Sequence, residues 1–166
     1  MAVTRTLILM RHASAAGGQR DEDRPLTEGG EVAAAAAGEW IRGALPSVDT
    51  VLCSVAVRTR QTLVALRIEA PTEYVEELYN GGVEDIVQQI GLVPDSQRTV
   101  LVIGHAPGIP ATAYRLATVD DSAPAPLTEQ LRYFSAGALA VLRTDARWDE
   151  LVDGAAELVT VRHPDG

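Results

Sequence analysis

Three runs of the chain consist almost entirely of apolar residues, at 6–10 (TLILM), 49–53 (DTVLC) and 99–103 (TVLVI). Near-continuous apolar character is typical of strands buried on both faces, as in a parallel sheet that is covered by helices. Two later runs, 137–143 (GALAVLR) and 156–162 (AELVTVR), also have the composition of strands. Because only the stretch TDARWDELVDGA separates these two, we expect them to pair antiparallel at one edge of the sheet.

Helices are predicted between the strands. The segment 28–43 has Thr27 as a candidate N-cap and two acidic residues in its first turn, and it carries Val32, Ala36 and Trp40 at helical spacing. Its alanine run is therefore interpreted as helix and not as low-complexity sequence. We predict further helices over 56–67, 82–91 and 107–117.

The alternation of strands and helices predicts an α/β fold. We expect a three-layer sandwich with a mostly parallel central sheet, an antiparallel edge strand, helices on both faces and no large helical cap. A length of 166 residues fits one domain, residues 1–166, with a core of its own. The proline-containing stretch 122–127 (SAPAPL) is too short to separate domains and is interpreted as a surface loop.

Charge and composition narrow the possible partners. All 14 basic residues are arginine, and 23 acidic residues leave a formal net charge of -9. Such a charge repels a phosphate backbone, so we expect no nucleic-acid partner. No stretch has the length of a membrane span, no secretory signal is visible, and Cys53 is the single cysteine, so we expect a cytoplasmic protein without a membrane partner.

Polar side chains follow each of the first three predicted strands. The first strand ends at Arg11 and His12, the second leads through Ser54 to Arg58, and the third ends at His105. Ligands of open α/β sheets bind beyond the carboxyl ends of the strands. A lone histidine after a strand is more often structural, but two of them with arginines nearby favour a binding site. We expect the third histidine, His163, to be solvent-exposed, and we interpret the arginines that flank strands as ordinary surface charges, namely Arg5, Arg143 and Arg162.

Two histidines and two arginines suit the chemistry of phosphoryl transfer. The sequence has neither the spacing of a metal-ligand cluster nor a phosphate-binding loop of the GxxxxGK[ST] type, so we expect no metal and no cofactor. Arginine offers a planar fork of donors that matches phosphate oxygens, and it stays charged. A neutral imidazole can act as a nucleophile if its other ring nitrogen is bonded to an acceptor. A protonated carboxyl group could donate a proton to the leaving group.

Five motifs in register, MRHASA, RPLTEGG, CSVAVRTRQT, EELY and VIGHAPG, resemble those of the histidine phosphatase superfamily, and more narrowly its small SixA-like branch of phosphohistidine phosphatases. The resemblance spans residues 6 to 142. It implies that His12 is the nucleophile that becomes phosphorylated and that Arg11 and Arg58 grip the phosphoryl group. It further implies that His105 stabilises charge in the transition state and that Glu77 protonates the leaving group.

Several neighbouring residues have competing interpretations. Glu77 could be a solvated acid, Arg24 could brace the loop 13–26 or approach the substrate, and Ser54 could donate a hydrogen bond at the site or cap the helix that follows. Arg60 should face away from the ligand because it lies two residues beyond Arg58. The chain departs from the family pattern at Ala13, Val55 and Ala106, of which the last leaves substrate preference open.

The short distance between Arg58 and His105 leaves no room for a large insertion, so we expect an open and shallow pocket. The sequence thus predicts a metal-independent phosphatase that works through a phosphohistidine at His12 and acts on protein phosphohistidine. A phosphatase of small phosphoesters is the alternative on the same site. A mutase is less compatible with an uncapped pocket, and a phosphate-binding module without turnover belongs to another class of function.

Overall fold

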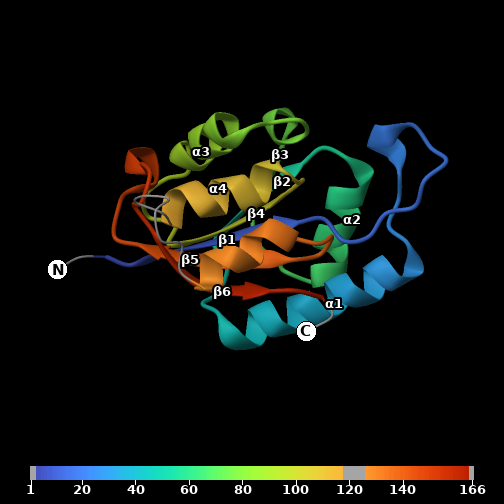
Figure 1. The fold of residues 1–166 in the computed structure, drawn as a ribbon, viewed down its shortest axis with the longest axis horizontal. Coiled ribbons are helices and arrows are strands. Elements are labelled where there is room, and N and C mark those ends of the chain that lie inside the picture. Colours follow the sequence, from blue (N-terminus) through green and yellow to red (C-terminus); the bar gives the residue numbers. More distant parts are fainter. Residues whose placement is uncertain (1–2, 118–125, 165–166) are drawn as a thin grey trace.

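A six-stranded sheet forms the centre of the protein (Figure 1). The computed structural model describes residues 3–117 and 126–164. The strand order is β3-β2-β4-β1-β5-β6, in which β1 to β4 are parallel, β5 is antiparallel to β1, and β6 is antiparallel to β5. The strands span Arg5–Arg11 (β1), Thr50–Ser54 (β2), Thr72–Val75 (β3), Thr99–Gly104 (β4), Leu139–Thr144 (β5) and Glu157–Arg162 (β6).

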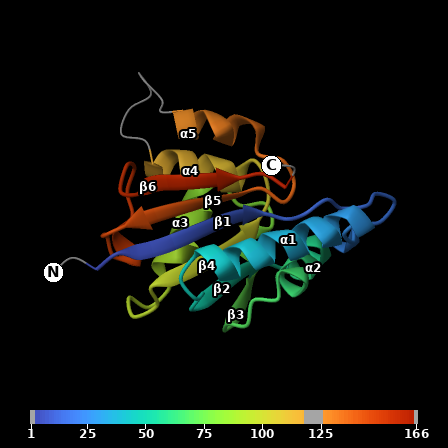
Figure 2. The same ribbon diagram turned by 90° about the horizontal axis from the view of Figure 1, so that it is seen from below.

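Helices cover both faces of this sheet (Figure 2). They span Glu28–Ala44 (α1), Val57–Leu66 (α2), Val83–Gly91 (α3), Gly108–Ala117 (α4) and Pro126–Glu129 (α5), with short 3-10 turns at Asp21–Asp23 (η1), Glu76–Leu78 (η2), Gln130–Tyr133 (η3) and Trp148–Glu150 (η4). Leu7 and Leu9 pack with α3 and α4, whereas Ile8 and Met10 pack with α1 and α2. This alternation along one strand confirms the predicted three-layer α/β sandwich.

The sequence missed the edge strand β3. Its residues are mostly polar and largely exposed, with only Val75 buried, so no continuous apolar run marks it. The loop expected over 122–127 lies outside the described residues up to 125, and Pro126 and Leu127 begin α5. The other predicted strands and helices are present, with boundaries that differ by one or two residues.

The apolar residues at helical spacing in α1 do not all lie on its buried face. Val32 and Ala36 are exposed, while Ala34, Gly38 and Ile41 face the core. The helix lies against α2 so closely that a Cβ atom at Gly38 would collide with the backbone of Leu66. Close packing of two backbones needs the smallest residues at the contact, and this requirement outweighs the larger apolar side chains. Thr27 caps the helix as predicted, accepting a hydrogen bond of 3.0 Å from the amide of Gly30.

Three residues predicted at the surface are partly or fully buried. Arg5 is 6% exposed, forms an ion pair of 3.5 Å with Asp95, and donates a hydrogen bond to the carbonyl of Ala146. Arg162 is half-buried beneath Trp40, with its guanidinium carbon 6.0 Å from the ring centroid. His163 is half-buried, with its ring 6.3 Å from that of Phe134. Arg143 is exposed as expected.

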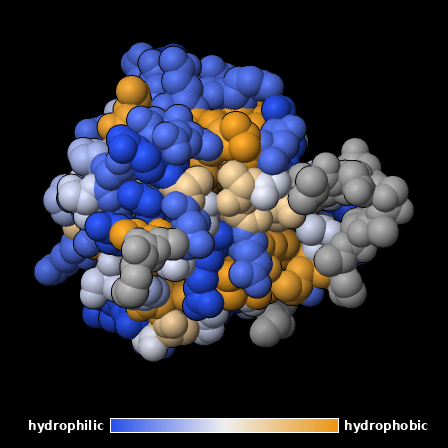
Figure 3. All heavy atoms as spheres, turned by 90° about the vertical axis from the view of Figure 1, so that its left-hand side faces the viewer, coloured by the Kyte–Doolittle hydropathy of each residue, from blue (hydrophilic) through white to orange (hydrophobic). Residues whose placement is uncertain are grey.

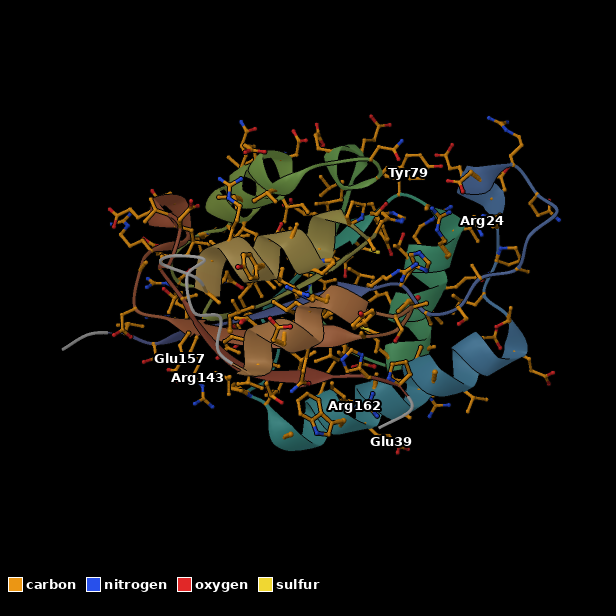
Figure 4. All side chains as sticks on the ribbon, viewed as in Figure 1. Arg24, Glu39, Tyr79, Arg143, Glu157 and Arg162 are labelled. Carbon is orange, nitrogen blue, oxygen red and sulfur yellow. The ribbon has the colours of Figure 1, made fainter. Side chains whose placement is uncertain are left out.

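None of the helices in the described part of the chain combines the length and the apolar character that crossing a membrane requires. Figure 3 shows the end of the molecule at which β1 and the other parallel strands begin, where hydrophobic surface lies in patches between hydrophilic residues. The polar groups predicted to form a site lie at the opposite end, where the parallel strands finish (Figure 4).

Candidate active site

The register of two central strands brings both histidines together. Arg11 at the end of β1 is paired with Gly104 at the end of the neighbouring β4, so His12 and His105 leave the sheet side by side. The amide of His12 donates a hydrogen bond of 3.0 Å to the carbonyl of Gly104. The centroids of the two imidazole rings lie 5.3 Å apart. A single tetrahedral anion could therefore contact both rings.

His12 is held as a neutral imidazole with one ring nitrogen free to attack. The residue is 8% exposed, and its Nδ1 lies 2.7 Å from the backbone carbonyl of Ala13. A carbonyl only accepts, so Nδ1 carries the proton and Nε2 keeps its lone pair. Burial, together with the positive charges of Arg58 and Arg11, lowers the pKa of His12 to about 4. This is the arrangement that a histidine nucleophile needs.

His105 is also neutral, and both of its ring nitrogens form hydrogen bonds. Its Nε2 lies 2.8 Å from the hydroxyl of Ser54, and its Nδ1 lies 3.3 Å from Nη2 of Arg58. Because a guanidinium only donates, Nδ1 accepts and Nε2 donates to Ser54. Burial, followed by the neighbouring His12 and Arg58, lowers the pKa of His105 to about 3. The hydroxyl of Ser54 thus takes part in the site as an acceptor and not as the donor that the sequence suggested; it also accepts a hydrogen bond of 3.5 Å from the amide of Ala56, although the N-cap position of α2, Ala56 itself, has no side-chain cap.

Arg11 and Arg58 each present a buried donor without a partner. Arg11 donates from Nη1 to the carbonyl of Phe134 at 3.0 Å, and Arg58 donates from Nη1 to the carbonyl of Asp21 at 2.6 Å. Among the described residues, neither Nε atom has a hydrogen-bond partner, although both are buried. Burial and the charge of Arg58 lower the pKa of Arg11. A buried donor left unpaired is costly, and an anion beside the two guanidinium groups would relieve that cost.

Two further residues belong to the site that the sequence did not single out, Asp21 in η1 and Tyr79 after η2. The Tyr79 hydroxyl donates a short hydrogen bond to Asp21 Oδ2, and Arg24 forms an ion pair of 3.1 Å with Asp21 Oδ1. Figure 4 shows Tyr79 and Arg24 at the same end of the molecule, where Tyr79 follows η2 and Arg24 follows η1. The signal available in the sequence was only an acidic residue three positions before Arg24. Such a residue is indistinguishable from a solvated charge until the loop is folded.

The predicted groups surround a cavity of about 450 Å³. Its lining includes Arg24, so this arginine both braces the loop through Asp21 and faces the pocket. Ala106 and Pro107 form an exposed part of the rim. The cavity is lined by Arg11, His12, Arg24, Arg58, Tyr79, Asn80, Gly81, Gly82, Val83, His105, Ala106, Pro107, Gly108 and Ala111, a set that contains no carboxylate.

Glu77 is not brought into this group. It lies in η2 with an exposed side chain and is absent from the cavity lining, whereas Tyr79 two positions later is part of it. Arg60 is exposed, as its helical position predicted. Cys53 is buried in β2, and burial raises the pKa of its thiol to about 12, so this cysteine behaves as a core residue.

Within residues 3–117 and 126–164, no three His, Cys, Asp or Glu side chains gather as a metal-binding group. Positive charge at the cavity comes instead from three arginines, Arg11, Arg24 and Arg58. Residues 55–98 form only α2, β3, η2 and α3, so the chain between β2 and β4 has no helical insertion that covers the cavity.

Comparison with known proteins gives a consistent result. Residues 7–90 match the model of the histidine phosphatase superfamily (branch 1). The chain is 40% identical over 157 residues to an uncharacterised protein of Mycobacterium tuberculosis. The aligned residues make up 93% of this chain and 99% of that protein. A Nakamurella multipartitia structure that bears the name of the phosphohistidine phosphatase SixA is 49% identical, covers 99% of both chains, and superposes with a TM-score of 0.93. A SixA structure in complex with tungstate is 23% identical over 96% of this chain and 97% of that chain, and it shares the fold with a TM-score of 0.78.

Proposed function

Because the chain belongs to the histidine phosphatase superfamily and is a SixA-like phosphatase, we propose that it hydrolyses phosphohistidine in proteins through a phosphohistidine of its own at His12. His12 Nε2 attacks the phosphorus, the new N–P bond forms as the bond to the substrate's imidazole breaks, and the dephosphorylated histidine leaves. Water then attacks the phosphorylated His12, which releases inorganic phosphate and restores the free imidazole. Each half-reaction replaces one bond to phosphorus by another.

In this proposal the arginines and the second histidine stabilise the transferring group. Arg11 and Arg58 line the cavity together with His12, and their guanidinium groups are suited to the equatorial phosphoryl oxygens. A dianion next to His105 would favour the protonated form of its ring, because an opposite charge nearby raises the pKa of an imidazole. Protonated Nδ1 can no longer accept the hydrogen bond from Arg58, and its N–H could then donate to the phosphoryl group.

The observation that carries the choice of substrate is the absence of an acid from the cavity lining. No carboxylate is among the described residues that line the cavity, and Asp21, which pairs with Arg24 and Arg58, is kept ionised by its lowered pKa. An alcohol leaving from a phosphoester needs a proton at that moment. The imidazole of a phosphohistidine can instead take up a proton on its second nitrogen near neutral pH, since the pKa of a histidine ring is about 6.5. A phosphohistidine substrate therefore needs no acid from the enzyme to protonate its leaving group.

The shape of the cavity agrees with a side chain presented by a large partner. The rim at Ala106 and Pro107 is exposed, and the chain between β2 and β4 has no inserted helical segment over the cavity. A pocket of this kind admits a phosphorylated side chain without enclosing the rest of the substrate. Water has equally free access, which favours hydrolysis over retention of the phosphoryl group.

The test compares three substrates at equal concentration, a phosphohistidine peptide, the matching phosphoserine peptide and a sugar phosphate. We expect kcat/KM for phosphohistidine to exceed the other two by about 100-fold, an order set by the absent acid catalysis. His12→Ala measures the spontaneous loss of phosphate from phosphohistidine. Equal or faster turnover of the sugar phosphate would replace our proposal with a phosphatase of small phosphoesters. Phosphate binding without any hydrolysis, even of p-nitrophenyl phosphate, would indicate a binding module.

A further inference from the structure

Asp21 connects three separate parts of the active site. Its Oδ2 lies 3.2 Å from Nη2 of Arg58 and accepts the hydrogen bond from Tyr79, while its Oδ1 lies 3.1 Å from Nη2 of Arg24. These partners come from α2, from the segment after η2 and from the loop that follows β1. One carboxylate therefore bridges two guanidinium groups and a phenol.

The contact with Arg58 is made twice, once by the side chain and once by the backbone. Nη1 of Arg58 donates to the Asp21 carbonyl at 2.6 Å, and Nη2 donates to the carboxylate. Nη2 also contacts His105, so these contacts engage both terminal nitrogens. A guanidinium carries five N–H donors, and two of them stay without a partner among the described residues, the buried Nε–H and the second N–H of Nη1. The orientation of the guanidinium, and with it the direction of these donors, depends on Asp21.

No other acid can replace this contact. Among the described residues, Asp21 is the only acidic residue within ion-pair distance of Arg58. The Arg58 side chain is 6% exposed, whereas that of Asp21 is 58% exposed. A buried guanidinium without its counter-ion is poorly stabilised, so loss of the exposed carboxylate should disturb the buried arginine more than the fold. The hydrogen bond from Tyr79, and then Arg58, lowers the pKa of Asp21 to about 2, which keeps the carboxylate charged at working pH.

We propose that Asp21 is a positioning residue, which holds Arg58 in the orientation that binds the phosphoryl group. Asp21 itself does not line the cavity, and it acts through its partners there, of which Arg58 is the buried one that it contacts with both backbone and side chain. The inference rests on the proposed binding of the phosphoryl group by Arg58, but it does not depend on whether the phosphoryl group comes from histidine or from an ester.

The neighbouring Asp23 provides a matched control. It lies in the same 3-10 turn, its side chain is exposed, and no ion pair joins it to another described residue. We expect Asp21→Ala to lower kcat/KM for p-nitrophenyl phosphate by about 30-fold, the scale of a lost hydrogen bond between charged groups. Asp23→Ala should stay within twofold of the wild type. Equal effects of the two substitutions would contradict the proposal, since they would reflect only surface charge.

A double-mutant cycle tests the route of the effect. If Asp21 acts through Arg58, Asp21→Ala should change kcat/KM by less than threefold once Arg58 is already alanine, while in an Arg11→Ala background it should retain most of its 30-fold effect. A full effect of Asp21→Ala in the Arg58→Ala background would overturn the inference. The inhibition constant of orthovanadate, measured in the same variants with the same substrate, should rise in parallel with the loss of kcat/KM.

This cycle is independent of the substrate proposal. If the wild type prefers a phosphoester, the phosphohistidine proposal fails while the cycle on p-nitrophenyl phosphate remains valid. If instead Arg58→Ala has no effect on hydrolysis or on vanadate inhibition, the phosphoryl-binding role of Arg58 fails and the positioning role of Asp21 fails with it. Melting temperatures within about 3 °C of the wild type would exclude unfolding as the cause of a loss.

Discussion

The imidazole rings of His12 and His105 lie with their centroids 5.3 Å apart and their planes inclined by 59°. They belong to positions 93 residues apart in the chain, and neither ring stacks flat on the other. Both ring nitrogens of His105 form hydrogen bonds, with Ser54 and Arg58, whereas Nε2 of His12 has no partner among the described residues. Hydrolysis should therefore depend on each histidine in a different way.

Removal of the proposed nucleophile, His12, should abolish turnover. We expect His12→Ala to lower the hydrolysis of p-nitrophenyl phosphate by about 1,000-fold or more, because the covalent intermediate can no longer form. Wild-type enzyme quenched in alkali during turnover of a radiolabelled substrate should carry an acid-labile phosphoryl group. His163→Ala is the control, since this histidine lies outside the cavity. Activity of His12→Ala close to that of the wild type would refute the mechanism.

Arg58 and Arg60 offer a comparison within one helix. Arg58 is 5% exposed and faces the cavity, whereas Arg60 is exposed to solvent. We expect Arg58→Ala to reduce kcat/KM by about 100-fold, the range of one or two hydrogen bonds to a charged group. Arg60→Ala should change it by less than twofold. Steady-state kinetics with p-nitrophenyl phosphate decides this, and similar losses in both variants would contradict the assigned orientation.

The two histidines should also make the stability of the fold depend on pH. Their pKa values are about 4 for His12 and about 3 for His105, below the usual 6.5. The unfolded chain therefore takes up protons first as the pH falls. The free energy of unfolding should decrease between pH 6.5 and pH 3, and the contribution of these two groups should be constant above pH 7. Denaturant titrations measure the decrease, and NMR titration of the folded protein should place the His12 midpoint near pH 4. A midpoint near 6.5 would disprove the burial argument.

Hydrolysis should continue in excess EDTA. Three guanidinium groups, those of Arg11, Arg24 and Arg58, line the cavity and supply the positive charge that a dianionic phosphoryl group requires. We expect initial rates to remain within twofold of those without chelator. Loss of turnover that returns on addition of Mg²⁺ would show that the arginines are not sufficient.

Glu77 tests whether the enzyme supplies an acid. The residue is exposed and does not line the cavity, so Glu77→Gln should change kcat by less than twofold on both p-nitrophenyl phosphate and an alkyl phosphate. These two substrates differ in their need for a proton on the leaving group. A loss confined to the alkyl phosphate would restore Glu77 as the proton donor, the role implied by the family resemblance.

Local patterns predicted the features that depend on neighbouring residues in the chain. The continuous apolar runs identified β1, β2 and β4, and the residues that follow them marked Arg11, His12, Arg58 and His105. The edge strand β3 was missed because edge strands need no apolar run. Asp21 and Tyr79 were missed because their role arises from a contact across 58 residues of chain, which no spacing rule reveals.

The packing of helices was predicted less well than their positions. Apolar residues at helical spacing identified α1 as a helix but not its buried face, because Val32 and Ala36 are exposed and the close contact with α2 is made at Gly38. Arg5 was assigned to the surface from its position beside a strand, although its partners Asp95 and Ala146 lie far along the chain and cover it. The buried face of α1 and the burial of Arg5 both depend on tertiary contacts, which a single sequence does not display.

The pairing of Arg11 with Gly104 also limits how this architecture can vary. Successive residues of a strand point to opposite faces, so an insertion of a single residue in β1 or β4 would reverse the direction of the histidine that follows it. Two inserted residues would preserve the direction but lift one ring by roughly 6.6 Å along the strand. Evolutionary changes in length are thus expected in the loops at the far end of the molecule and not in these two strands.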